Sequence, residues 1–390
     1  NEIIQLRAQV LSTQGQLQLA LGQAEDALDT WQAAEALYDR LAYSPGTIGT
    51  QINQAQALEA LGLYRRSCAT VLQAFGISDL TCEAIADEST LDRVSLWENR
   101  ILTAFANQPE ALQGEGLRIL GNTLRLTGKL AQSQTVLERS LELATTPQAE
   151  SAAYLSLGNT ARALGDRIAT QQESRNRPKT PRKESADPWD CQSATDNPEA
   201  IAYYQKAAAS PSPTIRVQAQ LNLWELQPDT ALLTDIQSQL SRLSPSRSSV
   251  FARVKYARHL VCAGLPDAIP ELDRAIQQAT AIEDKRAQSY ALGILGQVYE
   301  SQQQWAAAQT HTQQALSLAQ ALPAPEIAYQ WQWQLGRILK QQGVEEEAIA
   351  AYAEAVKTLK TLRSDLVALN PDIQYDFRDE VEPVYRQFVE

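Results

Sequence analysis

A pattern of small and apolar residues recurs along this chain at fixed spacing. Within 331–359 it comprises Leu335, Gly336, Leu339, Gly343, Ala348, Tyr352 and Ala355, at successive spacings of 1, 3, 4, 5, 4 and 3. These spacings follow the helical period, break once near Gly343 and then resume. Small residues at such positions favour places where two backbones come close. The pattern therefore predicts an antiparallel pair of helices joined by a tight turn.

Further copies of the pattern are found by the small residue near the middle of the first helix, here called the marker. The eight markers are Gly15, Ala55, Gly121, Gly158, Asn222, Ala257, Gly296 and Gly336. The copies around 222 and 257 are weak, with second helices expected near 230–243 and 267–282. In the copy that begins at Gly158, the second helix comes 30 residues late. Each pair alone would expose an apolar face, and only stacking on its neighbours covers that face.

Two segments depart from the repeat. Residues 171–198 are rich in Pro, Ser and charge, and we expect them to form a flexible loop inserted between the two helices of the fourth repeat. Its basic run, from Arg175 to Lys183, is interpreted as a solvated loop, with an acidic partner or anionic lipid as the alternative. Residues 76–113 do not fit the repeat, and an extra helix is expected there at 89–105.

Composition supports a helical array. A chain of 390 residues is past the size at which one globular core usually divides, whereas an array has no such limit. With 44% apolar residues it can fold, and almost no β-type alternation is present. A net charge of −12 argues against a nucleic-acid partner, which would need a basic surface. No apolar run is long enough for a transmembrane segment. We predict an all-α, right-handed α-solenoid of about eight helix-turn-helix repeats.

The repeat resembles the tetratricopeptide repeat (TPR), whose Leu-Gly, Gly, Ala and aromatic positions it matches one by one. A second resemblance extends over most of the chain. The segment LRSDLVALNPDIQYDFRDEVEPVYRQFVE, with EDKRAQSYALGILGQVYE, IAYQWQWQLGRILK and LGNTARALGD upstream, is similar to the TPR regions of large cyanobacterial proteins that precede a caspase-like CHAT domain. This implies a TPR-like superhelix at 1–360 and a helical linker at 361–390. The catalytic His and Cys of that family would belong to a CHAT domain after Glu390.

The sequence contains no motif typical of a catalytic site. There is no nucleophile motif, no glycine-rich phosphate loop and no paired carboxylates in a recognisable cleft, so we expect no enzyme and no cofactor. Two histidines and four scattered cysteines do not supply a metal site. The thiols are interpreted as buried or idle, with a Cys68–Cys82 disulfide as the alternative in an oxidising compartment.

Candidate binding residues follow from the TPR resemblance. In that family, ligand contacts come from the positions one and four residues after the marker. A spacing of three residues keeps the two positions on one helical face. With two further candidates, Arg118 and Trp333, the set is Arg118, Asn122, Arg125, Asn159, Arg162, Trp333, Arg337 and Lys340. Amide and guanidinium donors in a row suit an acidic peptide or a terminal carboxylate. The alternative is that they only solvate a groove or bridge neighbouring repeats. Five tryptophans are interpreted as packing residues unless they prove exposed: Trp31, Trp224, Trp305, Trp331 and Trp333. Trp333 is therefore considered under both interpretations.

The function that these features favour is a scaffold for protein–protein interaction, which binds a peptide or protein and presents it to, or regulates, a C-terminal caspase-like domain. The rival hypothesis is an architectural subunit that self-associates through its terminal repeats. The chain begins at Asn1 without a signal sequence, and we expect a processed piece of a longer protein. By comparison with the family, an exported or membrane-associated protein in a cyanobacterium is favoured over a cytoplasmic one.

Overall fold

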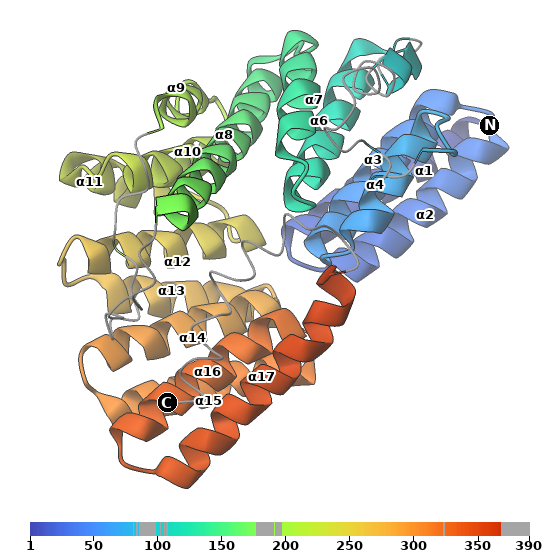
Figure 1. Cartoon of the computed structure of the whole chain (residues 1–390). Coiled ribbons are helices and arrows are strands. Elements are labelled where there is room, and N and C mark those ends of the chain that lie inside the picture. Colours follow the sequence, from blue (N-terminus) through green and yellow to red (C-terminus); the bar gives the residue numbers. More distant parts are fainter. Residues whose placement is uncertain are drawn as a thin grey trace. The chain divides into compact units, whose positions relative to one another are not determined.

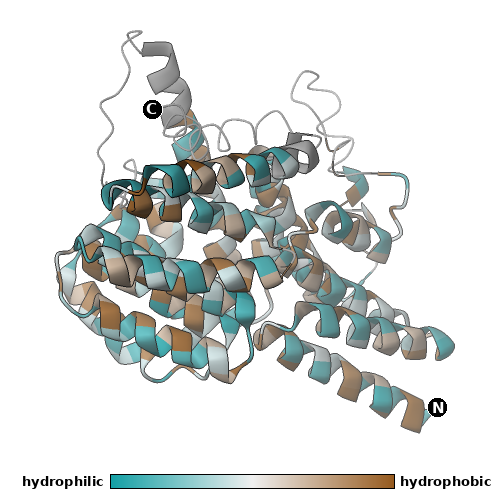
Figure 2. Cartoon of the chain, turned by 90° about the horizontal axis from the view of Figure 1, so that it is seen from below, coloured by the Kyte–Doolittle hydropathy of each residue, from teal (hydrophilic) through white to brown (hydrophobic). Residues whose placement is uncertain are grey.

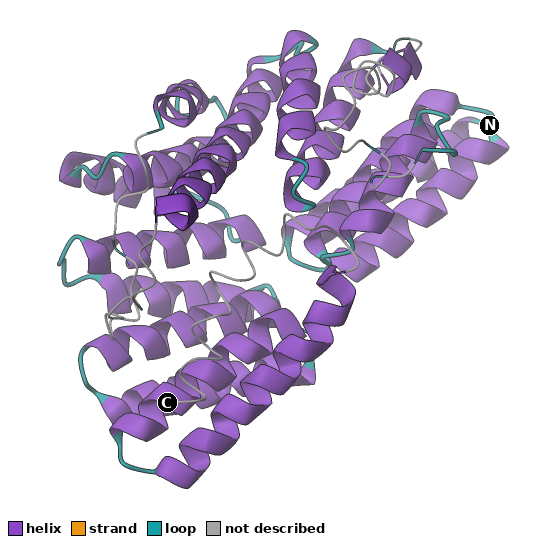
Figure 3. Ribbon diagram, in the orientation of Figure 1, coloured by secondary structure: helices purple, strands orange, loops and turns teal. Residues whose placement is uncertain are grey.

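The computed structural model describes residues 1–80, 108–176, 197–322 and 324–367, together with 82, 85, 99–101, 103, 104, 106 and 191. For 169–176 and 362–367 it describes the backbone alone. Every regular element in these ranges is an α-helix, and they contain no strand (Figure 3). The prediction of an all-α solenoid of helix pairs is confirmed.

Residues Asn1–Asn176 and Ala194–Leu226 form one compact unit, here called unit 1 (Figure 1). Its first helices, each lying beside the next, are α1 (Glu2–Ala20), α3 (Ser44–Ala60), α6 (Glu110–Leu126), α8 (Pro147–Asn176) and α10 (Pro213–Leu226). The second helices that pack on them are α2 (Ala24–Arg40), α4 (Tyr64–Ala74), α7 (Leu130–Glu142) and α9 (Pro198–Ala207). The first helices thus form one continuous layer of unit 1.

The second compact unit, unit 2, comprises Arg177–Ser193 and Gln227–Glu390. Its described helices are α11 (Thr230–Leu240), α12 (Arg247–Cys262), α13 (Ala268–Ala281), α14 (Lys285–Ser301), α15 (Trp305–Ala321), α16 (Pro325–Gln341) and α17 (Glu345–Val367). The first helices α12, α14 and α16 again lie side by side. The boundary between the units falls between α10 and α11, inside the fifth predicted repeat.

The marker glycines bring the two helices of a pair close together. At Gly296 an added Cβ would lie 3.1 Å from the backbone oxygen of Ala308, and at other markers it would meet a large side chain of the second helix. A Cβ atom at Gly15 would lie 2.5 Å from the Trp31 ring, and one at Gly158 would lie 2.5 Å from the Tyr204 ring. Gly336 stands in the same relation to Tyr352, at 2.8 Å. A large side chain of the second helix therefore rests on the bare backbone of the first.

The turns between paired helices use left-handed backbone. Gly22 and Gly343 have φ of 86° and 79°, a conformation that glycine adopts without a steric penalty. Gln303 occupies the aligned turn between α14 and α15 with φ 59°. A side chain there carries a cost that glycine would avoid.

The inserted loop of the fourth repeat begins later than predicted. Helix α8 continues to Asn176, so residues 171–176 are helical and Gly165 lies inside a helix instead of at a turn. No helix-breaking residue intervenes, and the helix ends shortly before Pro178, which disfavours helical backbone in the residue that precedes it. Helix α9 begins at Pro198, where the Asn197 side chain accepts a hydrogen bond from the amide of Ala200 at 3.0 Å. The rest of the predicted loop, including most of its basic run, lies outside the described residues.

Three other boundaries also differ from the prediction or are only partly described. Helix α17 continues through the predicted boundary at 360 to Val367, and 368–390 lie outside the described residues. Helix α11 ends at Leu240 instead of 243. Of the extra helix predicted at 89–105, residues 99–101, 103 and 104 are helical and the others are not described.

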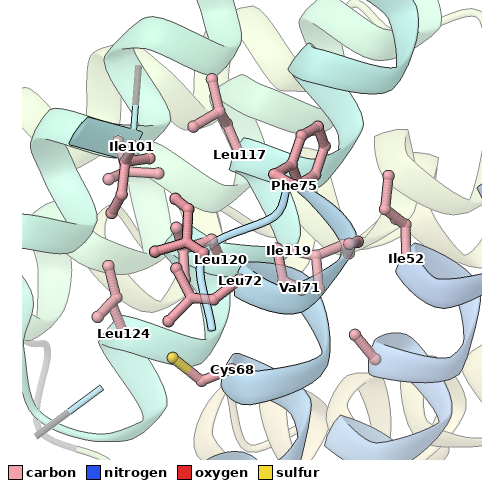
Figure 4. Packing of buried hydrophobic residues seen from close by; sticks show 14 of the residues in the cluster. Ile52, Cys68, Val71, Leu72, Phe75, Ile101, Leu117, Ile119, Leu120 and Leu124 are labelled. Atoms are coloured by element: carbon pink, nitrogen blue, oxygen red, sulfur yellow. The ribbon is translucent and has the colours of Figure 1, made fainter. Parts of the chain in front are cut away.

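One buried cluster of unit 1 lies mainly between α3, α4 and α6 (Figure 4). Leu72, Leu117 and Leu120 pack there without solvent exposure. Cys68, at the edge of the cluster, is paired with Cys82, and their Cα atoms are 6.2 Å apart. A second disulfide, which the sequence analysis missed, joins Cys191 to Cys262 at the end of α12, with a Cα separation of 5.3 Å.

The tryptophans expected to serve packing divide into two groups. Trp31, Trp224 and Trp331 are buried. Trp305 and Trp333 are half-buried.

Candidate functional site

Three of the predicted binding residues follow one another along a single face of α6. Arg118, Asn122 and Arg125 are separated by four and three residues, and this spacing places them in one row. The row faces the neighbouring first helices, since α6 packs against both α3 and α8. We call Arg118, Asn122 and Arg125 the α6 row.

Arg118 is paired within the protein. Its guanidinium contacts the Glu115 carboxylate at 2.6 Å, and Gln56 of α3 donates to the same carboxylate at 3.0 Å. Although burial disfavours the charged form, the charge of Glu115 raises the pKa of Arg118. The pair neutralises itself and bridges α3 to α6.

Glu59, at the end of α3, was not among the predicted site residues. It is half-buried, and the hydroxyl of Thr123 on α6 donates a hydrogen bond to it. Burial raises the pKa of the Glu59 carboxyl to about 7, and the nearby charges of Arg118 and Arg125 offset only part of that rise. Glu59 is therefore about half protonated at neutral pH.

Arg125 differs from the other arginines of the row. Its Nε atom is buried and has no hydrogen-bond partner among the described residues. Burial lowers the pKa of its guanidinium, and the charge of Glu59 opposes that effect. The half-buried Asn122 lies one turn earlier on the same helix. Arg125 thus carries a buried donor that the rest of the described protein leaves unsatisfied.

The predicted residues of α8 are engaged with α9 and α10. The Oδ1 atom of Asn159 accepts from the Tyr204 hydroxyl at 3.0 Å and from Nδ2 of Asn222 at 2.8 Å. The Arg162 guanidinium is paired with Glu225 of α10. Burial raises the pKa of Tyr204, whose hydroxyl lies within the electrostatic reach of both Arg125 and Arg162.

In unit 2 the predicted residues lie on α16. Arg337 makes two hydrogen bonds to the Glu300 carboxylate of α14, each of 2.8 Å, and both side chains are largely buried. Its guanidinium also lies 4.7 Å from the Trp333 ring centroid, a cation–π contact. Lys340 is exposed. Arg337 thus joins neighbouring repeats, whereas Trp333 packs within its own helix pair.

The carboxylates that the sequence analysis missed occupy the positions from which it inferred binding. Glu59 and Glu300 each lie four residues after a marker, the same position as Arg125 and Arg162. The prediction considered only repeats with a basic or amide side chain at the positions one and four residues after the marker. Applied to every repeat, it also selects Glu59, which interacts with Arg118 and Arg125 of the next first helix, and Glu300, which pairs with Arg337 of the next first helix.

The described residues contain no group of three or more His, Cys, Asp and Glu side chains arranged to hold a metal ion. None of the helices in the described ranges combines the length and the apolar composition needed to cross a membrane.

Comparison with known proteins gives a local match. No curated protein matches the sequence. Among solved structures, a Rap protein complexed with competence and sporulation factor is 12% identical over 92% of this chain and 78% of that one, with a TM-score of 0.48. BtubC from P. vanneervenii is 14% identical over 70% and 89%, with a TM-score of 0.37. The TPR2AB domain of yeast Sti1, in a complex with pHSP90, is 14% identical over 85% and 98%, with a TM-score of 0.29. Residues 332–358, in α16 and α17, match the family model of the tetratricopeptide repeat, so the chain contains a TPR region.

Proposed function

We propose that the first-helix layer of unit 1 binds an acidic group of a protein partner, and that Arg125 is its anchor. A TPR region is typically a non-catalytic scaffold for protein–protein interaction. The observation that carries the proposal is the buried Nε of Arg125, which has no hydrogen-bond partner among the described residues. An unsatisfied donor costs free energy, and the Arg125 residue as a whole is only half-buried, so a partner can approach its side chain.

The charges around Arg125 favour a carboxylate as that acceptor. Arg118, Arg162 and Arg337 each have a Glu partner, whereas the carboxylate with the largest electrostatic effect on Arg125 is Glu59, which is half protonated at neutral pH. A ligand carboxylate can therefore supply the charge that Glu59 supplies only in part. Asn122 is one turn away and provides an amide for a neighbouring backbone group of the ligand.

A peptide array tests this proposal. Octapeptides with Asp and Glu are compared with copies carrying Asn and Gln instead, each with a free or an amidated C-terminus. We expect the chain to retain acidic peptides, and Arg125→Gln to retain about tenfold less of them. The control is Arg139→Gln, since Arg139 is an exposed arginine of α7 paired with Glu142. Equal retention by Arg125→Gln and the native chain would contradict the proposal.

We also propose, from the resemblance of the sequence alone, that the scaffold presents its partner to a caspase-like domain of the parent protein, in an exported or membrane-associated cyanobacterial protein. The supporting observation is the LNP, FR and VEPVYR sequence within 369–386. The parent gene tests this directly: it should encode a catalytic His and Cys after Glu390. Fractionation of the source cells should then place the parent protein outside the cytoplasm, and a parent gene without these residues would rule the idea out.

A further inference from the structure

Helix α1 carries a row of large apolar side chains open to solvent. Ile3, Leu6, Val10 and Leu17 are 84%, 62%, 57% and 60% exposed. Spacings of three, four and seven residues place them on one side of the helix, at the a and d positions of a heptad. Figure 2 shows apolar residues recurring along the helix that begins at the N label. We call these four residues the α1 stripe.

Two residues of the α1 stripe, Val10 and Leu17, stand at positions of the repeat that are buried in all the later first helices. Val10 and Leu17 lie five residues before and two residues after the marker Gly15. The aligned residues are buried in all seven other first helices, for example Thr50 and Ala57 in α3, or Trp331 and Ile338 in α16.

The second helix of the preceding repeat provides this cover. Ser67 of α4 contacts Thr123 of α6 at 3.2 Å, and Ser133 of α7 contacts Thr160 of α8 at 3.0 Å. Thr123 and Thr160 are the residues aligned with Leu17. The α1 stripe therefore occupies an interface position of the repeat, and it is continuous with the repeat-to-repeat interfaces of unit 1.

We propose that the α1 stripe is the contact between two copies of this chain, paired through α1 about a two-fold axis. The other large exposed apolar residues are isolated: no two of them lie three, four or seven residues apart on one described helix. The described part of the chain thus offers no second stripe for a head-to-tail contact, whereas α1 complements itself. An isologous pair buries both stripes and closes the assembly.

The charges on α1 favour parallel helices. When Ile3 and Leu6 are a and d, Glu2 is a g position and Arg7 is the following e position. In a parallel two-stranded contact, Glu2 of each copy lies beside Arg7 of the other, which gives two ion pairs of opposite charge. Both side chains are exposed and accessible for this pairing.

Sedimentation velocity over about a hundred-fold range of concentration tests the pairing. The native chain should reach roughly twice the 43.0 kDa mass of one chain as concentration rises. The double variant Val10→Glu, Leu17→Glu should weaken association at least about tenfold, because four carboxylates would meet in the contact. The control Ile168→Glu, at a residue of α8 that is 54% exposed, should associate like the native chain. All three proteins should melt at similar temperatures, since the altered side chains are exposed.

A cysteine variant tests the orientation. In parallel helices Ile3→Cys places the two new thiols side by side, so mild oxidation should give a covalent dimer. In antiparallel helices centred on Val10 the same thiols would be about 21 Å apart. A native chain that stays monomeric, a double variant that dimerises as well as the native chain, or an Ile3→Cys variant that fails to cross-link would each overturn the proposal. The acidic-peptide site of α6 is a separate surface, and its test does not depend on this one.

Discussion

At the scale of single residues, the marker glycines carry the contact between paired helices. Gly158 lies under the Tyr204 ring, whose hydroxyl also donates to Asn159. Gly158→Ala should therefore displace the ring and lower the free energy of unfolding by roughly 1–3 kcal/mol. Thermal unfolding followed by circular dichroism measures this.

Gly49→Ala is the matched control for Gly158→Ala. Gly49 is a glycine of α3 whose added Cβ would lie 3.6 Å from Leu112, an ordinary contact. Alanine should stabilise the helix there by roughly 0.5–1 kcal/mol. If both substitutions had the same effect, the marker contact would not have the role assigned to it.

Glu59 makes the stability of unit 1 depend on pH. The folded carboxyl has a pKa raised by burial from 4.5 to about 7, so between these values the folded state holds a proton that the unfolded state has released. Stability should consequently fall as the pH rises through this window, by roughly 1–3 kcal/mol. Urea unfolding at several pH values should give a flatter dependence for Glu59→Gln than for the native chain. An unchanged slope would show that Glu59 titrates normally.

At the scale of elements, the turn between α14 and α15 is less favourable than its neighbours. Gln303 has φ 59°, whereas Gly343 at the aligned turn has φ 79°. Gln303→Gly should stabilise the chain by roughly 0.5–1 kcal/mol, because glycine adopts this conformation without the steric cost of a side chain. The reverse substitution, Gly343→Gln, should lower the melting temperature. If Gln303→Gly destabilised the chain and Gly343→Gln stabilised it, the contacts of the glutamine side chain would outweigh the backbone strain.

The Cys191–Cys262 disulfide constrains the chain over a sequence separation of 71 residues. Because the disulfide restricts the unfolded chain, its loss should lower the free energy of unfolding by about 4 kcal/mol. The double variant Cys191→Ser, Cys262→Ser should therefore melt well below the native chain under oxidising conditions. With a reductant the variant should lose less stability than the native chain. A variant that melts like the oxidised native protein would indicate that this pair does not form.

The helix pairs could be predicted from sequence because their contacts repeat locally. A marker and its second-helix residue, such as Gly15 and Trp31, are close in sequence and recur with each copy. Arg118, Arg125 and Arg162 could be placed on first helices for the same reason. Glu59 and Glu225, which interact with arginines of a neighbouring first helix, were missed because no pattern within one repeat indicates a contact with the next. The Cys191–Cys262 pair joins an inserted segment to a distant helix, and no local pattern signals it.

At the scale of the whole molecule, charged pairs join neighbouring first helices in both units. Arg162 with Glu225 and Arg337 with Glu300 are such pairs, one in each unit. These pairs satisfy buried charges and connect neighbouring repeats. Arg125 is the exception, because Glu59, the carboxylate that acts on it most strongly, is half protonated at neutral pH. This exception makes unit 1 the candidate for partner binding.

The most direct test is a fluorescence anisotropy titration of a labelled acidic octapeptide at about pH 6 and about pH 8. Binding should be several-fold tighter at the lower pH, because protonation of Glu59 removes a competing carboxylate from Arg125 while the peptide carboxylates stay ionised. Glu59→Gln should bind tightly at both pH values, and Arg125→Gln weakly at both. Binding that is equal at the two pH values, or that persists in Arg125→Gln, would contradict the account.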